Sequence, residues 1–276
     1  MISGELEPVL RLGLFASGFL LFAVLEVVFG DRPLSITRWR RWPHNLGLML
    51  VSTIVARLVF PAAAVGVALF AEQRGIGLFP LLGIEGLAAV IATIVILDLV
   101  VWGQHVVFHR VPLLFRLHRV HHADNEFDVS LATRFHPLEI VLSMAIKSAA
   151  VIVIGAPPLA VLVFEVILNL TSMFNHANIR IPGPADRVLR WIVVTPGMHR
   201  IHHSVRPSET NANFGFNLPW WDRLAGVYRA SSADQPIVIG LPGYQAKREQ
   251  PLSWLLLLPF QRTTAPIPAA AEGSFK

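Results

Sequence analysis

The sequence contains no cysteine, only two tyrosines and few charged side chains. Without thiolates it cannot form disulfides, ligate an iron–sulfur cluster or bind zinc through sulfur. Charged residues make up 15% of the 276 residues, whereas 54% are hydrophobic. Soluble domains carry about 25% charged residues. The composition therefore argues against an ordinary soluble protein, and we read the net charge of +5 as a membrane feature rather than as a sign of a nucleic-acid partner.

Five apolar stretches alternate with polar connections. Three are long, namely Leu6–Phe29, Leu46–Phe70 and Leu81–Trp102. About 20 helical residues cross the hydrocarbon core, so each of these predicts a transmembrane helix. Two shorter stretches, Leu138–Ile154 and Leu159–Phe174, flank a Gly-Ala-Pro-Pro turn and predict a short helical hairpin that either spans or re-enters. We expect an all-α integral membrane protein: about three long transmembrane helices, this hairpin and a cytoplasmic helical cap that carries a histidine-rich dimetal site.

No internal domain boundary is evident. We expect residues 1–262 to form a single membrane-embedded domain, with the motif-bearing core at residues 80–230. The segment Pro251–Phe260 is too short to span and predicts an interfacial or docking segment. The tail Thr263–Lys276 is rich in proline and alanine and is expected to be disordered. The first apolar stretch is too long, and too acidic at its leading end, for a cleavable signal peptide.

Arginine predicts the orientation in the membrane. The connection Gly30–Pro43 holds four arginines, whereas Ala71–Phe79 holds only Arg74. The two long polar segments, Gln104–Pro137 and Ala177–Arg229, are arginine-rich throughout. The positive-inside rule therefore places the N-terminus outside and both polar segments in the cytoplasm. Arginine outnumbers lysine 20 to 3 among the 23 basic residues, which favours a GC-rich bacterial source and a bacterial inner membrane.

Histidine is unusually abundant, with 11 residues. Eight of them fall into His-x3-His, His-x2-His-His and again His-x2-His-His spacings: His105, His109, His118, His121, His122, His199, His202 and His203. Residues three or four apart share one face of a helix, so each motif can direct two or three imidazoles toward one point. Neutral imidazole binds Zn, Fe, Cu and Ni.

Eight ligands exceed the about four to six that one ion takes, which predicts two metal ions. His136 and His176 are candidates to complete the set, whereas His44 belongs to no cluster. We predict no catalytic residue beyond the metal ligands.

Three polar residues inside the apolar stretches have two readings. Asp98, Asn169 and Glu165 could support ligating histidines or line a cavity, or they could make contacts between helices. Asp98 lies seven residues before His105, about 10 Å along a helix, and would have to serve a histidine of another segment. For Glu165, an interhelical contact such as a pair with Lys147 is the favoured reading.

The order of the motifs resembles the fatty acid hydroxylase superfamily, and most closely its sterol desaturase branch, including bacterial members. The resemblance covers Asp98–Arg229 and rests on the three histidine motifs together with Arg134-Phe-His136-Pro-Leu138, Asn175-His176, Asn213-Phe-Gly215 and Trp221-Asp222-Arg223-Leu224. It implies a helical membrane monooxygenase with a cytosolic di-iron centre that uses O2 to hydroxylate or desaturate a lipid. The eight clustered histidines match the family's motif histidines, and His136 and His176 match additional ones.

The histidines alone do not distinguish iron from zinc, because imidazole ligands suit both metals. Iron is what the resemblance implies. The substrate stays open among sterols, hopanoids, fatty acyl chains and related lipids. Two alternatives use the same histidines. A membrane metal-binding or transport protein would place its ligands at the bilayer midplane. A metal-dependent lipid hydrolase would need a general base, for which Asp124, Glu126, Asp128 and Glu139 are available.

Oxidation of a C–H bond by O2 takes two external electrons for each turnover, and the chain offers no source for them. It has no cysteine and no dinucleotide-binding fingerprint. We therefore expect a separate electron donor, a ferredoxin or a cytochrome with its reductase. Such a carrier would dock on a cytoplasmic face rich in arginine: Arg110, Arg116, Arg119, Arg187 and Arg190.

Overall fold

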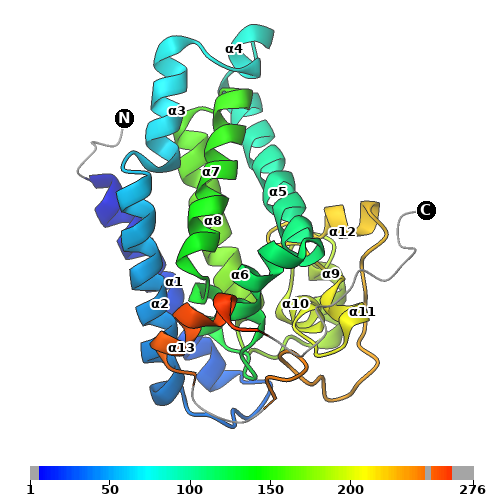
Figure 1. The fold of residues 1–276 in the computed structure, drawn as a ribbon. Helices are drawn as coiled ribbons and strands as arrows, with labels where there is room; N and C mark the ends of the chain where they lie inside the picture. The colour runs from blue at the N-terminus through cyan, green and yellow to red at the C-terminus, as the bar shows by residue number, and fades with distance from the viewer. Residues whose placement is uncertain (1–5, 246–249, 263–276) are drawn as a thin grey trace.

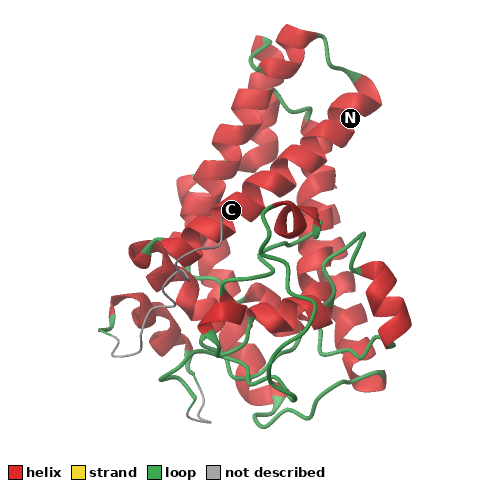
Figure 2. Ribbon diagram, turned by 90° about the vertical axis from the view of Figure 1, so that its right-hand side faces the viewer, coloured by secondary structure: helices red, strands yellow, loops and turns green. Residues whose placement is uncertain are grey.

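The computed structural model describes residues 6–245 and 250–262. Long helices lie side by side, and most of the short helices and loops gather at one end of this bundle, whereas α4 (Leu78–Leu82) lies at the other end (Figure 1). Within the described residues the chain is helical, with two isolated β-bridges and no strand (Figure 2). The expected tail, Thr263–Lys276, lies outside the described residues.

Five helical segments in the described part of the chain are long and apolar enough to cross a membrane. They comprise α1 (Leu6–Val28), the α2–α4 segment (Arg38–Leu82), α5 (Gly86–Arg110), α7 (Pro137–Ile154) and α8 (Pro158–His176). The prediction of an all-α, multi-pass membrane protein is thereby confirmed. Many outward-facing side chains are apolar and exposed, among them Leu58 at 76% and Leu87 at 73%, as lipid-facing positions require.

The boundaries of two helices differ from those expected from hydropathy. The second apolar stretch is split into α2 (Arg38–Val59) and α3 (Ala63–Arg74), because Pro61 cannot donate the backbone hydrogen bond that a continuous helix needs. Helix α2 begins eight residues before Leu46, and α5 continues eight residues past Trp102. In both cases the helix extends beyond the apolar run into polar sequence. One continuous helix, α5, therefore both crosses the membrane and carries histidines near its end.

The turn between α7 and α8 reaches the far end of the bundle. Gly155 has a left-handed backbone, with φ +68°, and ends α7. A Cβ at this position would lie 2.6 Å from the carbonyl oxygen of Ile76, in the loop between α3 and α4 (Leu78–Leu82). The hairpin thus lies with its turn against the loop between α3 and α4. Its helices of 18 and 19 residues are each about 27 Å long, which favours full spanning over re-entry.

The core of the bundle is an apolar cluster from α3, α5, α7 and α8. It includes Ala68, Leu97, Val151, Val161 and Phe164, all nearly inaccessible to solvent. Small alanine side chains allow close approach of the helices. This packing holds the C-terminal ends of α5 and α8 next to each other at the capped end of the bundle.

The cap covers these helix ends with short elements: α6 (Pro112–His122), η1 (Val129–Thr133), α9 (Gly183–Leu189), α10 (Pro196–His202), α11 (Pro207–Thr210), α12 (Trp220–Leu224), α13 (Leu252–Leu257) and η2 (Leu258–Phe260). The last two form the expected docking segment. Leu255 and Leu258 are fully buried against Leu48 of α2 and Phe115 of α6.

Candidate metal centre

Four elements of the structure bring nine histidines together. Helix α5 carries His105 and His109, one turn apart on the same face. Helix α6 carries His118, His121 and His122, and α8 ends on His176. Helix α10 with its C-terminal cap carries His199, His202 and His203. All nine are at most 3% exposed.

The nine histidines fall into two groups, in each of which the potential ligand atoms all lie within 4.8 Å of one another. The five-histidine group consists of His105, His109, His118, His122 and His202. The four-histidine group consists of His121, His176, His199 and His203. The two groups adjoin, since the stacked rings of His122 and His203 have centroids 4.5 Å apart.

Each His-x2-His-His motif contributes to both groups. In α6 the first and last histidines, His118 and His122, enter the five-histidine group, whereas His121 enters the other. In α10 the assignment is reversed: His199 and His203 enter the four-histidine group and His202 the other. The two histidines four apart lie on one side of the helix, whereas the third is adjacent to the last one in sequence and therefore points in a different direction. Two such motifs facing each other therefore bridge two ligand sets.

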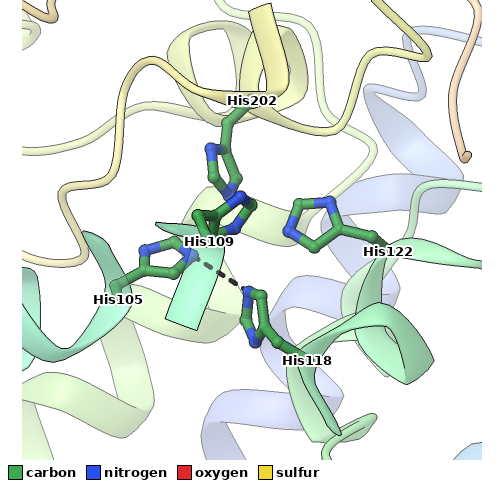
Figure 3. A group of neighbouring side chains, drawn as sticks. All are labelled: His105, His109, His118, His122 and His202. Carbon is green, nitrogen blue, oxygen red and sulfur yellow. Dashed lines mark hydrogen bonds between the residues drawn. The ribbon is translucent and has the colours of Figure 1, made fainter. Parts of the chain in front are cut away.

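Within each group, ring nitrogens point toward one another. Figure 3 shows the five-histidine group, in which the Nε2 atoms of His105 and His118 lie 3.1 Å apart. In the four-histidine group, Nε2 of His176 lies 3.1 Å from that of His121 and 3.0 Å from that of His199. A metal–nitrogen distance of about 2.1 Å places adjacent ligand atoms about 3.0 Å apart at 90°. These separations fit pairs of nitrogens that share one ion.

The partners of the Nδ1 atoms determine which tautomers are present. His105, His176 and His202 direct Nδ1 at the backbone carbonyl oxygens of Phe214, Ser172 and Ala212, at 2.7, 2.7 and 2.8 Å. A carbonyl oxygen only accepts, so each Nδ1 carries the hydrogen and each Nε2 presents a lone pair. The Nε2 of His202 is buried and has no partner among the described residues. Lone pairs that converge without hydrogens between them fit a cation.

Burial keeps the cap histidines neutral. The pKa of His202 is lowered to about 3, chiefly by desolvation, and the pKa values of His199 and His203 fall well below their usual range for the same reason. Neutral imidazole is the form that ligates metals. The donor set of neutral, buried and convergent imidazoles therefore suits two transition-metal ions.

Aromatic rings enclose both groups. Phe135 stacks on His121, with centroids 4.5 Å apart, and Phe127 stacks on His176 at 5.9 Å. Phe214 contacts the five-histidine group, with its centroid 5.2 Å from that of His109. These rings fix the imidazole planes and keep water away from the ligand atoms.

His136, expected as a completing ligand, is not brought together with the nine. Its Nε2 donates to the carbonyl oxygen of Leu256 at 3.2 Å, and its Nδ1 accepts from the backbone N–H of Leu138, where it caps α7. Both ring nitrogens are thus used by the protein. His44 also lies outside both groups, as expected. His176, the other expected addition, belongs to the four-histidine group.

Asp98 supports the segment that contains Leu218 and Trp221 rather than a histidine. Its Oδ2 accepts from the indole N–H of Trp221 at 2.7 Å and from the backbone N–H of Leu218 at 3.3 Å. Asp222 acts similarly and accepts from the backbone N–H of Phe214 at 2.9 Å. Burial raises the pKa of Asp222 to about 6. These carboxylates position the backbone whose carbonyl orients His105.

Glu165 and Asn169 lie away from the histidines, on α8 within the membrane. Glu165 forms ion pairs with Arg11 at 2.7 Å and with Lys147, so the interhelical reading holds for this residue. Asn169 donates its side-chain N–H to the carbonyl oxygen of Glu165 at 2.8 Å. Neither residue contacts a histidine of the two groups through a hydrogen bond among the described residues.

One carboxylate, Glu139, forms a direct hydrogen bond with a grouped histidine and is not among the supporting residues expected from the sequence. Nδ1 of His118 donates to Oε1 of Glu139 at 2.7 Å, and both side chains are at most 3% exposed. Histidine ligands commonly donate their second N–H to a carboxylate, which fixes the ring and raises its basicity. The sequence alone identifies Glu139 only as an available general base. Glu139 lies in the first turn of α7, directly after the motif that contains His136. This position is the signal that could have identified it.

Comparisons with known proteins agree with this geometry. A family model described as fatty acid hydroxylase matches residues 90–227, half of the chain, which includes all nine grouped histidines. The ornithine lipid hydroxylase OlsE of Rhizobium tropici is 29% identical over 159 residues, which cover 57% of this chain and 47% of that protein. The cholesterol 25-hydroxylase of Mus musculus is 28% identical over 232 residues, covering 78% of this chain and 73% of that protein.

A third relative, the very-long-chain aldehyde decarbonylase GL1-1 of Oryza sativa subsp. indica, is 30% identical over 164 residues, covering 55% of this chain and 26% of that protein. The chain therefore spans about half of the ornithine lipid hydroxylase, and less of the decarbonylase. No solved structure matches. The family match, the order of the histidine motifs and their convergence into two groups lead to one conclusion: this chain is a member of the fatty acid hydroxylase family.

Proposed function

We propose that this protein is a membrane-bound, O2-dependent oxidoreductase that hydroxylates a C–H bond of a lipid at a centre of two iron ions. One observation carries the proposal: nine buried histidines direct lone pairs into two adjoining groups of five and four. Relatives named for hydroxylation of ornithine lipid and of cholesterol support a lipid substrate. A sterol, a hopanoid, a fatty acyl chain or a related lipid would suit a site at a membrane surface.

The chain's own residues would hold and shield the two ions. The five-histidine group would bind one ion and the four-histidine group the other, with Glu139 orienting His118. Bound iron would supply the redox chemistry that C–H oxidation by O2 requires and that no side chain provides. Phe127, Phe135 and Phe214 would exclude water from the ligand atoms.

The environment of the nearby carboxylates argues against a lipid hydrolase. Asp124 is ion-paired with Arg41 at 2.7 Å, and Asp128 with the same guanidinium at 2.6 Å. Glu126 accepts from the backbone N–H of Ile36, and Glu139 from His118. All four candidate bases are thus engaged in structural contacts, so none of them is placed to activate a water between the groups.

The position of the groups argues against a transporter. Transport sites lie near the bilayer midplane on interrupted helices. Here both groups lie where α5 and α8 end and the cap begins (Figure 1). This placement suits an enzyme that meets a lipid at the membrane surface.

We further propose that the cap faces the cytoplasm of a bacterial inner membrane, with the N-terminus outside, as the arginine distribution indicates. Reporter fusions that end after Arg41 and after Arg74 test this orientation. The first should report the cytoplasm and the second the outside, and the reverse result would overturn the proposal. An external ferredoxin or cytochrome with its reductase would deliver electrons to the cap from the cytoplasmic side.

The central experiment measures metal and product together. Wild type, His202→Ala and the control His44→Ala are expressed in the same host under 18O2, and the lipid extracts are compared by mass spectrometry. We expect a hydroxylated lipid that carries one 18O atom with wild type and His44→Ala only, whereas the same product without the label would show that its oxygen does not come from O2. Two iron ions per chain without any oxygenated lipid, or zinc with hydrolysed lipid, would refute the proposed reaction.

A further inference from the structure

A cavity of about 800 Å³ opens between the end of α1 and the start of α2. One wall is apolar and includes Val24, Val27 and Val28. Arg32 and Arg38 also line the cavity. None of the nine grouped histidines lines this cavity. It is therefore separate from the candidate metal centre.

The cavity lies at the level of the membrane surface. It occupies the junction at which the first membrane span ends and the second begins, on the same end of the bundle as the cap (Figure 1). Val27 is 72% exposed and Val28 63% exposed, so this wall faces the surrounding lipid chains. Trp39 and Trp42 also line the cavity, and tryptophan is favoured at the headgroup level of a bilayer.

The two arginines that line the cavity outnumber its one carboxylate, Glu26. Arg38 is paired with Glu26 at 3.3 Å, but no ion pair involves Arg32 within the part of the chain that the structure describes. Oε1 of Glu26 is itself engaged by the backbone N–H groups of Val129 and Asn178, at 2.6 and 2.8 Å. The cavity thus presents a net cation at its polar end.

The backbone that carries Arg32 is held in place before any ligand arrives. The side-chain N–H of Asn178 donates to the carbonyl oxygen of Arg32 at 2.7 Å, and the backbone N–H of Asp31 donates to the carbonyl oxygen of Asn178 at 3.1 Å. The backbone N–H of Arg180 donates to the carbonyl oxygen of Phe29 at 2.8 Å. These bonds tie the connection between the first two spans to the segment that follows α8. Such preorganisation reduces the entropic cost of binding.

We propose that this cavity binds one anionic phospholipid from the leaflet nearest the metal centre. Its phosphodiester lies against Arg32 and Arg38, and its acyl chains lie along Val24, Val27 and Val28. Guanidinium groups bind phosphate oxygens through charge-assisted, often bidentate hydrogen bonds. The exposed apolar wall favours a lipid over a free phosphate, which would leave that wall without an occupant. The bound lipid is a resident of the fold rather than the molecule that reacts, since the cavity contains no candidate ligand histidine.

Native mass spectrometry of the purified, detergent-solubilised full chain tests this site. The protein is titrated with phosphatidylglycerol and, separately, with phosphatidylcholine of the same acyl chains. We expect one phosphatidylglycerol bound per chain, with an apparent Kd about tenfold lower than that for phosphatidylcholine. Arg32→Gln should raise the Kd for phosphatidylglycerol about tenfold, the loss expected from one charge-assisted contact. Arg40→Gln removes the same charge from a residue of α2 that does not line the cavity, and should leave the Kd within about twofold.

A second variant tests the apolar wall without changing any charge. Val28→Trp places a large side chain at an exposed position of the cavity and should weaken phosphatidylglycerol binding while helix content by circular dichroism stays constant. Equal binding of the two lipids by wild type, or unchanged binding in both Arg32→Gln and Val28→Trp, would overturn the site. Displacement of phosphatidylglycerol by millimolar inorganic phosphate would show that the cavity takes a free anion, and would overturn the lipid assignment. No readout depends on catalytic activity, so the result is independent of the proposed reaction.

Discussion

Replacement of Glu139 by alanine should loosen the metal ion of the five-histidine group while the other ion stays bound. Glu139 itself belongs to neither histidine group. It accepts the Nδ1–H of His118 at 2.7 Å and so directs Nε2 of that ring toward His105. In Glu139→Ala the Nδ1–H is left buried without an acceptor, and the imidazole is free to rotate. The four-histidine group contains no member that contacts Glu139 through a hydrogen bond among the described residues.

The magnitude follows from the kind of contact that is lost. Removing a carboxylate that orders a ligating histidine lowers metal affinity by about 10- to 100-fold, equivalent to about 1.4–2.7 kcal/mol. His118 and Glu139 are both nearly inaccessible to water, so solvent cannot replace the lost acceptor. We expect Glu139→Ala to lie near the upper end of this range. Glu139→Gln keeps an acceptor oxygen but loses the charge, and should lie near the lower end.

The assay is chelator competition followed by elemental analysis. Purified protein is equilibrated with increasing chelator, and the metal content per chain is measured. Wild type should lose its two ions at high chelator concentration. Glu139→Ala should lose one ion at about 100-fold lower chelator concentration and retain the other.

Glu126→Gln is the matched control. Glu126 is buried and accepts hydrogen bonds from the backbone N–H groups of Ser35 and Ile36, at 2.9 Å each, with no histidine involved. This variant should retain both ions at the wild-type chelator concentration. If Glu139→Ala retains both ions as firmly as wild type and Glu126→Gln, the assigned role of Glu139 in the five-histidine group is wrong.

Three further outcomes are expected. His202→Ala should lower the metal content from two ions per chain to about one. His136→Ala should leave it at two, because both ring nitrogens of His136 form hydrogen bonds with the backbone. Equal losses of metal in the two variants would contradict the grouping. Asp222→Ala should lower Tm by about 5 °C or more in thermal unfolding, since three buried N–H donors lose their acceptor, and an unchanged Tm would show that the loop does not need this carboxylate. Gly155→Ala should destabilise the protein by more than about 1–2 kcal/mol, because its φ of +68° alone costs that much and the added Cβ would lie 2.6 Å from the carbonyl oxygen of Ile76. Gly103→Ala, whose Cβ would meet nothing within 4 Å, should leave Tm the same or higher.

Much of the fold and the identity of most candidate ligands follow from local sequence. A transmembrane helix needs only a run of apolar residues of sufficient length, so all five segments were predicted, including the α7–α8 hairpin. The histidine motifs are equally local, because residues three and four apart share a helix face wherever the helix lies. Hydropathy could not locate the ends of α2 and α5, since both helices continue into polar sequence that water and the cap can solvate.

Only the tertiary structure decided which side chains meet. The sequence predicts two ions but does not determine that His121 and His202 each cross to the group opposite their motif partners. It does not separate His176, which the end of α8 places among the ligands, from His136, which faces Leu256. These choices depend on how α5, α6, α8 and α10 pack against one another. A contact between residues far apart in the chain is set by the packing of whole helices, and a local pattern carries no information about the partner it will face.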